Sequence, residues 1–365
     1  MKICFIDWFA YPLFNPKSNI VFGGAQIQLY LLAKELAKNK NFKIFFLTDN
    51  QKNNQQEVFD QIKVFQMFRS PQAFGYLGFF VQFLAQLRQI NADIFIQRAA
   101  SAETGLIALI CWLLRKKFIF MVAHIQDVNG DFMKKNGWRG KLFGFGLILA
   151  DRIVCQTRDQ QRQLSKNLRG KSVIVPLAYP IKPRLRQKNI NKQGILWVAR
   201  AETWKNPELL LALAAKFPRE KFTMICPPAE NNPDYFKIIK AKAKQISNLQ
   251  FIAWVPFNKI DAFFRKSRVF VSTSFSEGFP NTFIQAAKNM TPIVSYQVDP
   301  DKIISQNKLG FCAKGDEKML TEYLKKVLRN QKFWRRLSDR AYQYAVGHHD
   351  LSEVVDKFKS IVLNW

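Results

Sequence analysis

Residues 269–296, VFVSTSFSEGFPNTFIQAAKNMTPIVSY, contain two short apolar runs separated by a polar turn and a helical segment. Each run has the length and the Val, Ile and Phe content of a buried strand. Gly278 and Pro280 predict a tight turn after the first run, and the helix is expected at 282–289. The order strand, turn, helix, strand favours an α/β fold.

The same alternation continues in both directions from this segment. Further strands are expected at KICFIDWF (2–9), FKIFFLT (42–48), ADIFIQR (92–98), KFIFMVA (117–123), DRIVCQT (151–157), GILWVAR (194–200), KFTMIC (221–226) and LQFIAW (249–254). Helices are expected within 22–39, 77–90, 103–114, 138–149, 207–216, 233–246 and 258–266, with charged helices over 317–346. Continuous apolar strands alternating with amphipathic helices predict parallel sheets covered on both faces.

A chain of 365 residues is too long for one ordinary core and predicts two domains. The alternation lapses over 178–193, a basic, Pro-containing segment that is the best linker candidate. We therefore expect two doubly wound, Rossmann-like domains facing a central cleft, 1–182 and 183–345. Residues 346–365 are expected to form a C-terminal helix that can pack back on the N-terminal domain.

The chain carries 56 Lys and Arg residues against 27 Asp and Glu, a formal net charge of +29. Such an excess attracts phosphorylated ligands, anionic lipid surfaces or nucleic acid. Compositional drift explains it equally well, because Phe, Lys, Asn and Ile are all abundant, as in AT-rich coding sequences. No RNA-binding aromatic motif or zinc-finger spacing is present, so we expect no nucleic-acid partner.

Five scattered cysteines show no metal-binding or redox spacing, which indicates reduced thiols in a cytoplasmic protein. The start, MKICFIDWFAY, has Asp7 inside its apolar run and is expected as a strand, not as a signal peptide. The longest apolar stretches are shorter than the ~18–20 residues of a membrane-spanning helix. Asp299-Pro300-Asp301 follows a strand, and turn formation explains it better than metal binding. No metal site is predicted.

Doubly wound sheets bind ligands beyond the carboxyl ends of their strands, where this chain places its unusual polar residues. The segment Gly278–Thr282 opens a helix whose free N–H groups and dipole suit a phosphate. Glu277 would repel that phosphate, so its carboxylate better suits neutral hydroxyls, as on a sugar, and Gln285 could bind a second set. The alternative is a Glu in a surface turn and a Gln on a solvated helix face.

Three further candidates follow other strands. Arg200 and Lys205 share one strand-to-helix loop and could clamp a diphosphate, or the loop is merely solvated. His124 ends a strand of the N-terminal domain and faces the expected cleft; the alternative is a buried imidazole with satisfied hydrogen bonds. Gly23-Gly24 lets the backbone approach a ligand closely. His348-His349 are expected at the surface.

Three segments together resemble the family 4 glycosyltransferases, which have the two-domain GT-B fold: FGGAQIQLYLLAKELAKN (22–39), ARAETWKNPELL (199–210) and SEGFPNTFIQAAKNMTPIV (276–294). They match that family's three main motifs in order and separation, and the similarity extends over nearly the whole chain. The family pattern in the last segment is E-x7-E, with Glu277 in the first slot and Gln285 in the second.

The resemblance implies a role for each candidate residue. Glu277 would hold hydroxyls of the donor sugar, and Arg200 and Lys205 would neutralise its diphosphate. His124 would lie near the transferred sugar and complete the catalytic residues. The donor-binding residues would be Gly23, Gly24, Gly278, Phe279, Pro280, Asn281, Thr282 and Gln285, the last at the ribose diol. The resemblance implies no cofactor or metal, only a nucleotide-sugar co-substrate, a UDP- or GDP-sugar.

Four residues depart from the family pattern. The carboxamide of Gln285 makes weaker hydrogen bonds than a carboxylate, so weaker nucleotide affinity is expected. Met290 stands where the family has a helix-ending Gly and costs roughly 1 kcal/mol if the slot keeps positive φ. Cys226 and Trp254 occupy glycine slots near the expected base pocket, where Trp254 could stack on the base or close the pocket.

The implied reaction is metal-independent transfer of a hexosyl group to a hydroxyl with retention of configuration. Residues 131–150 interleave Lys and Arg with Phe and Trp, which suits an anionic membrane surface. A glycan or lipid-linked acceptor of cell-envelope synthesis would follow, with peripheral contact at the inner face of the membrane; a core helix with a basic solvated end is the alternative. A nucleotide-sugar epimerase of the same architecture and a catalytically degenerate nucleotide-binding protein remain alternative functions.

Overall fold

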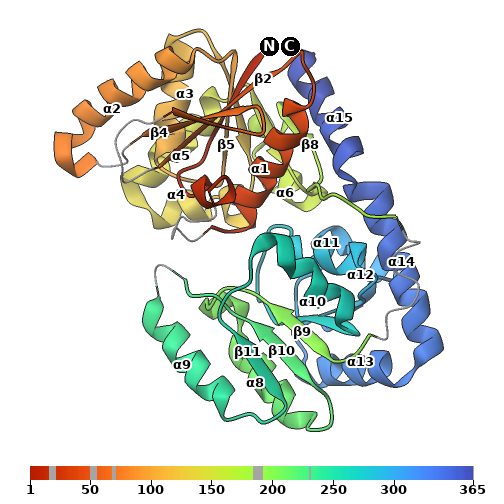
Figure 1. Cartoon of the computed structure of the whole chain (residues 1–365). Coiled ribbons are helices and arrows are strands. Elements are labelled where there is room, and N and C mark those ends of the chain that lie inside the picture. The colour runs from red at the N-terminus through yellow and green to blue at the C-terminus, as the bar shows by residue number, and fades with distance from the viewer. Residues whose placement is uncertain (16–21, 50–55, 68–70, 184–191, 230–231, 365) are drawn as a thin grey trace. The chain divides into compact units, whose positions relative to one another are not determined.

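The computed structural model describes residues 1–15, 22–49, 56–67, 71–183, 192–229 and 232–364, without the side chains of 71–77. The chain divides into two compact units, Met1–Ala178 with Leu351–Trp365, and Tyr179–Asp350 (Figure 1). From the sequence, the boundaries between the units were expected at 182/183 and 345/346. They lie at 178/179 and 350/351 because Tyr179 pairs with Asp350 in a parallel bridge of the second unit. Most of the expected linker, 184–191, lies outside the described residues.

The first unit contains an 8-stranded sheet in the order β3-β4-β2-β1-β5-β6-β7-β8. Its strands are β1 Lys2–Ile6, β2 Lys43–Asp49, β3 Gln56–Phe59, β4 Ile62–Met67, β5 Ile94–Arg98, β6 Lys117–Met121, β7 Arg152–Cys155 and β8 Ser172–Ile174. Only the β3–β4 pair is antiparallel among the described strands. This hairpin was not expected, because its turn residues Asp60 and Gln61 adopt positive φ without the usual Asn-Gly signal.

Helices cover both faces of this sheet (Figure 1). They are α1 Gly24–Ala37, α2 Pro71–Ile90, α3 Glu103–Leu113, α4 Asp131–Lys135, α5 Gly137–Leu149, α6 Arg158–Gln163, α7 Lys166–Arg169 and α15 Leu351–Leu363, with short 3-10 turns η1 Tyr11–Leu13 and η2 Ile125–Asp127. One core joins the sheet to α2, α3 and α5, through residues such as Phe83 and Phe143. A second core joins the opposite face to α1 and α15, through Leu29 and Phe358.

The second unit contains a parallel 6-stranded sheet in the order β11-β10-β9-β12-β13-β14. Its strands are β9 Ile195–Val198, β10 Phe222–Ile225, β11 Leu249–Ile252, β12 Val269–Ser272, β13 Ile293–Ser295 and β14 Gly310–Cys312. Its helices are α8 Pro207–Lys216, α9 Pro233–Lys244, α10 Ile260–Lys266, α11 Asn281–Lys288, α12 Ile303–Gln306, α13 Glu317–Arg329 and α14 Gln331–His349, with 3-10 turns η4 Thr203–Lys205, η5 Phe257–Lys259 and η6 Pro300–Lys302.

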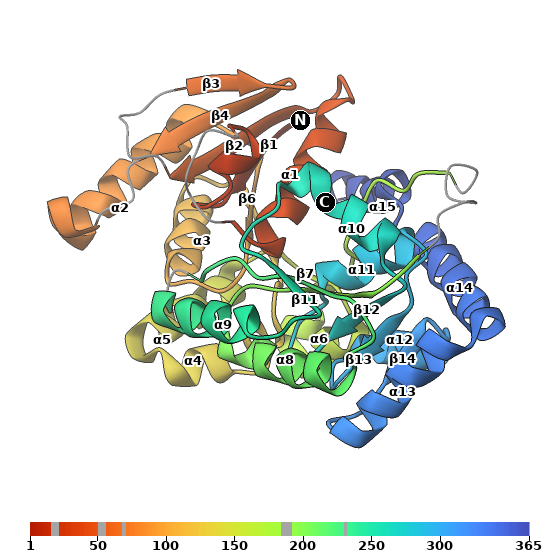
Figure 2. The same cartoon turned by 60° about the horizontal axis from the view of Figure 1, so that its bottom comes forward.

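Two layers of helices enclose this second sheet (Figure 2). Apolar residues of α8, α9 and α13 form the core on one face. On the other face, Phe270 of β12 packs against Phe264 of α10 and Phe283 of α11. The predicted doubly wound α/β architecture with two sheets is therefore confirmed.

No helix in the described parts of the chain is both long and apolar enough to cross a bilayer. All five cysteines are free thiols, and Cys312 is the one that is not buried. Asp299 accepts hydrogen bonds from the N–H of Ile304 at 2.8 Å and from the hydroxyl of Ser305 at 2.9 Å, which confirms its predicted role in a turn.

Candidate active site

In the second unit, the loops after the neighbouring strands β9 and β12 are bonded to each other. The indole N–H of Trp197 donates to the hydroxyl of Thr273 at 2.8 Å, and that hydroxyl donates to the carbonyl of Lys205 at 2.7 Å. The N–H of Phe275 donates to the carbonyl of Trp204 at 2.9 Å. These bonds fix the two loops that carry the predicted cations and the predicted carboxylate.

The Lys205 ammonium group and the Glu277 carboxylate form an ion pair between these loops. Their side chains are only 17% and 12% exposed, so the surface-turn alternative for Glu277 is wrong. Arg200 lies in the same β9 loop with 38% of its side chain exposed, and its Nη2 lies 3.6 Å from Oε1 of Glu202. Burial raises the pKa of Glu202, and the charges of Arg200 and Lys205 oppose that rise.

Helix α11 begins next to this ion pair with an open N-terminus. Its N-cap residue is Pro280, and no side chain caps the helix there. The first N–H groups of an α-helix have no partner within the helix, and its dipole makes this end positive. The segment Gly278–Thr282 therefore lies at the positive end of this helix, directly after Glu277 in the chain; that it binds a phosphate stays a prediction.

Gln285 lies one turn into α11, on the face of the helix that also carries Asn281. It is 5% exposed, so the alternative of a Gln on a solvated helix face is wrong. Met290 follows the helix with φ of 56°. This confirms that the position keeps the left-handed backbone conformation, which is unfavourable for a residue with a side chain. The N–H of Thr291 closes the helix end on the carbonyl of Ala286 at 2.9 Å.

Cys226 and Trp254, the two other residues that depart from the family pattern, differ in their exposure to solvent. Burial raises the pKa of the Cys226 thiol to about 12, so it remains protonated at neutral pH. Trp254 follows the edge strand β11 and is 59% exposed, so its indole is accessible to a ligand.

In the first unit, His124 follows β6 and is half-buried, so the alternative of a buried imidazole is wrong. Its Nδ1 accepts the N–H of Gln126 at 3.3 Å, which leaves the proton of a neutral imidazole on Nε2. The Asp127 carboxylate accepts the N–H groups of Ala123 at 2.8 Å and His124 at 3.0 Å. Burial raises the pKa of Asp127, while these two bonds and the charges of His124 and Arg98 lower it.

Gly23 caps the N-terminus of α1 in the first unit, and Gly24 is the first residue of that helix. The N–H of Gly23 donates to Oε1 of Gln26 at 2.8 Å, and the Gln26 amide donates to both oxygens of Asp7 at 3.0 and 2.8 Å. Asp7 is 6% exposed. The sequence did not predict this structural role for Asp7, although a carboxylate at the end of an apolar strand was a signal for it.

His349 was expected at the surface, and this expectation is wrong. It is 2% exposed, and its ring lies 5.2 Å from that of Phe279 in the loop before α11. Ala341, Ala345 and His349 recur every four residues of α14 and are all buried, so helical periodicity could have revealed the buried position. His348 is exposed, as expected.

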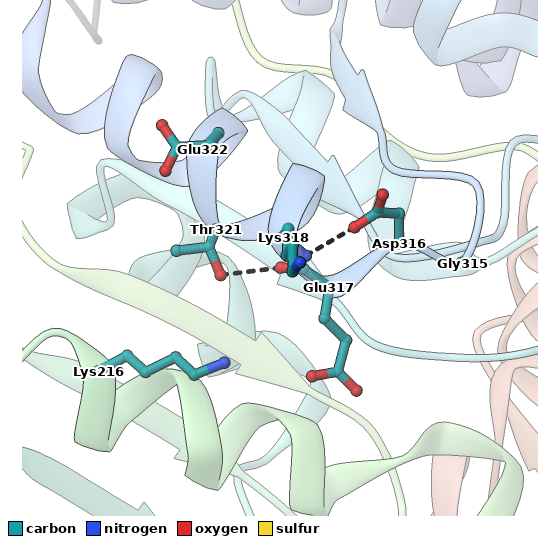
Figure 3. A pocket seen from close by; sticks show the side chains of 7 residues that line it. All are labelled: Lys216, Gly315, Asp316, Glu317, Lys318, Thr321 and Glu322. Atoms are coloured by element: carbon teal, nitrogen blue, oxygen red, sulfur yellow. Dashed lines mark hydrogen bonds between the residues drawn. The ribbon is translucent and has the colours of Figure 1, made fainter.

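A groove with a volume of about 1090 Å³ lies elsewhere on the second unit (Figure 3). Its lining residues are Lys216, Gly315, Asp316, Glu317, Lys318, Thr321 and Glu322. Asp316 accepts the N–H groups of Lys318 at 2.7 Å and Met319 at 3.0 Å, so the start of α13 is already capped. This acidic groove contains no predicted site residue and is a poor site for a phosphate.

Comparisons with known proteins agree with this division of the chain. The family profile described as Glycosyltransferase Family 4 matches residues 22–180, and the one described as Glycosyl transferases group 1 matches residues 182–344. A curated relative from Xenopus tropicalis, Glycosyltransferase 1 domain-containing protein 1, is 20% identical over 164 residues, or 44% of this chain and 47% of the relative. The match thus spans about half the length of that relative.

Solved structures resemble the chain over its whole length. Anabaena Alr3699/HepE, solved in complex with UDP, has a TM-score of 0.76 and 14% identity, covering 100% of both chains. Sucrose-phosphate synthase from Thermosynechococcus elongatus has a TM-score of 0.76 and 15% identity, covering 99% of this chain and 98% of its own. From the two profiles, which together account for most of the chain, and from the shared fold, we conclude that the chain belongs to the glycosyltransferases of the GT-B fold.

Proposed function

We propose that the protein transfers a sugar from a nucleotide-sugar donor to a hydroxyl acceptor with retention of anomeric configuration, as a family 4 glycosyltransferase. The observation that carries the proposal is the Lys205–Glu277 ion pair beside the uncapped N-terminus of α11. In this proposal the N-terminus of α11 supplies donors for the diphosphate, and Glu277 supplies a carboxylate for the sugar hydroxyls. The similar Alr3699/HepE has also been solved with UDP and glucose together.

The donor diphosphate would lie against Arg200 and the first amides of α11. Arg200 is the more exposed of the two predicted cations, and its planar guanidinium suits phosphate oxygens. Preorganised donors of this kind stabilise the charge that develops on a leaving group. In this proposal the protein's own cations and amides neutralise the diphosphate, and no metal or cofactor takes part.

Glu277 would accept hydrogen bonds from hydroxyls of the donor sugar. Its ion pair with Lys205 fixes the direction of the carboxylate. Lys205 would therefore act on the donor mainly through Glu277, and less as a separate phosphate clamp than the resemblance implies. Gln285 is buried, so it can bind the ribose diol only if the donor reaches the face of α11 that it shares with Asn281.

Transfer with retention would proceed by attack of the acceptor on the face that the leaving diphosphate vacates, with a phosphate oxygen taking the acceptor proton. His124 would donate its Nε2–H to a hydroxyl of the transferred sugar. The Gly23-Gly24 loop at the start of α1 would lie beside the phosphates and the acceptor. This mechanism requires no carboxylate nucleophile.

We propose a lipid-linked or cell-envelope glycan acceptor, reached by peripheral contact of the cytoplasmic protein with an anionic membrane. On α5, Trp138, Phe145 and Ile148 are 55%, 42% and 66% exposed, and Trp112 of the adjoining α3 is 65% exposed. Four exposed basic residues lie on α5 and on the preceding α4: Lys134, Lys135, Arg139 and Lys141. Apolar side chains framed by cations suit the interface of an anionic bilayer.

A panel of UDP-, GDP- and ADP-sugars, each with and without glycan or lipid-linked acceptors, tests the proposal. Release of a nucleoside diphosphate with formation of a glycosidic product of unchanged anomeric configuration is the expected result. A new sugar isomer would instead indicate an epimerase, and binding without turnover a degenerate nucleotide-binding protein. A thermal-shift screen against the free diphosphates identifies the base first, because a ligand that binds only the folded state raises the melting temperature.

A further inference from the structure

The chain crosses from one unit to the other twice, and Tyr179 and His349 each lie at one of these crossings. The first unit ends at Ala178 and resumes at Leu351. The N–H of Tyr179 donates to the carbonyl of His349 at 2.9 Å, beside the bridge between Tyr179 and Asp350. Backbone hydrogen bonds within the second unit therefore join the chain segments at the two crossings.

The side chains of both residues contact the start of α11. The Tyr179 hydroxyl lies 3.1 Å from Oδ1 of Asn281, the first residue of the helix, and donates to it. The His349 ring packs against Phe279, two residues before the helix, with ring centroids 5.2 Å apart. Tyr179 and His349 are 0% and 2% exposed, so neither side chain can touch a ligand from solvent.

We propose that Tyr179 and His349 are positioning residues for the donor loop, Gly278–Thr282. A helix start that must meet a diphosphate is effective only if its amides are already held in place. Phe279 and Asn281 lie on either side of Pro280, the N-cap residue of α11. His349 packs against Phe279, and Tyr179 is hydrogen-bonded to Asn281. This inference rests on the proposed function, because it assumes that the loop binds a nucleoside diphosphate.

Binding of UDP and GDP to single variants tests the inference. Tyr179→Phe removes only the hydroxyl, and we expect it to raise the Kd of the diphosphate that binds the wild type by about threefold to tenfold. His349→Ala removes the ring and should raise that Kd further, whereas His349→Phe keeps a ring and should restore most of the affinity. Tyr342→Phe and His348→Ala are matched controls, because the Tyr342 hydroxyl donates to the carbonyl of Lys182 and His348 stacks on Tyr344.

Hydrogen exchange of the amides of 278–284 provides a second measurement that needs no ligand. Faster exchange there in Tyr179→Phe and His349→Ala, with unchanged exchange in the two controls, is expected. A folded Tyr179→Phe variant with wild-type Kd and wild-type exchange would overturn the inference while leaving the proposed function intact. A wild-type protein that binds neither UDP nor GDP and transfers no sugar would overturn the proposed function first, and the inference with it.

Discussion

The ammonium group of Lys205 and the carboxylate of Glu277, 72 residues apart in the chain, form an ion pair across the loops that follow the neighbouring strands β9 and β12. Each charge offsets the other, and both side chains are largely shielded from solvent. Arg200, in the same loop as Lys205, is more accessible to a ligand. In the proposed function, Glu277 therefore binds hydroxyls of the donor sugar, and the more exposed Arg200 binds the diphosphate.

Replacing Glu277 by Gln should lower kcat/KM by about 10²-fold or more, because the neutral amide both weakens the bonds to the sugar and leaves Lys205 without its carboxylate. Sugar transfer and circular dichroism are measured together. The fold should remain intact, since the substitution keeps the shape of the side chain. Activity within threefold of the wild type, in a folded variant, would remove Glu277 from the site.

Replacing Arg200 by Ala should reduce kcat by about 10²–10³-fold, because a cation at the leaving diphosphate acts mainly in the transition state. Arg219→Ala is the matched control, since Arg219 is an exposed arginine of the same unit outside the site. Steady-state kinetics with saturating acceptor separate kcat from the KM of the donor. Equal losses in the two variants would show that the effect is one of net charge and not of position.

Lys192 should make the second unit more stable as the pH rises above neutral. Its ammonium group is buried and donates to the carbonyl of Phe264 at 3.2 Å, the carbonyl of Asn289 at 2.7 Å and the hydroxyl of Thr291 at 2.9 Å. Burial, with a smaller effect of Arg265, lowers the pKa of Lys192 from 10.5 to about 7. Between these two values the unfolded chain binds the proton and the folded chain does not, so stability is gained as the pH rises.

Urea unfolding at several pH values between 7 and 10 measures this dependence. Lys192 can add up to about 1.4 kcal/mol to the free energy of unfolding per pH unit. Lys192→Met removes the titrating group, and its free energy of unfolding should rise less over this range. Identical slopes for the two proteins would show that the pKa of Lys192 is not lowered by folding.

Flotation with vesicles tests whether the exposed apolar residues of α3 and α5 bind a membrane, as we propose. The wild type should bind vesicles that contain phosphatidylglycerol at low salt and lose most of that binding at high salt, because the attraction is partly electrostatic. Trp138→Ser with Phe145→Ser should weaken binding at any salt concentration. Ile238→Ser, at an exposed apolar residue of α9, is the control. Absence of wild-type binding at low salt would contradict the proposal.

The sequence predicted the elements around 269–296 correctly, because strands, turns and helix ends depend on residues close in the chain. The expected helix at 282–289 is α11, Asn281–Lys288, and the helix-ending slot at Met290 has positive φ as anticipated. Glu277, Arg200 and Lys205 were also selected as candidates from the sequence, because each lies in a loop that follows an apolar strand, and the family resemblance then implied their roles.

Only the tertiary structure decided which of these candidates meet. Nothing in the local pattern states that β9 lies beside β12, and without that order the pairing of Lys205 with Glu277 cannot be derived. The burial of His349 against Phe279 likewise depends on where α14 packs, and the hairpin β3–β4 forms without a local turn signal. The physical reason is that backbone preferences act over a few residues, whereas strand order and side-chain burial follow from packing the whole sheet and all its helices at once.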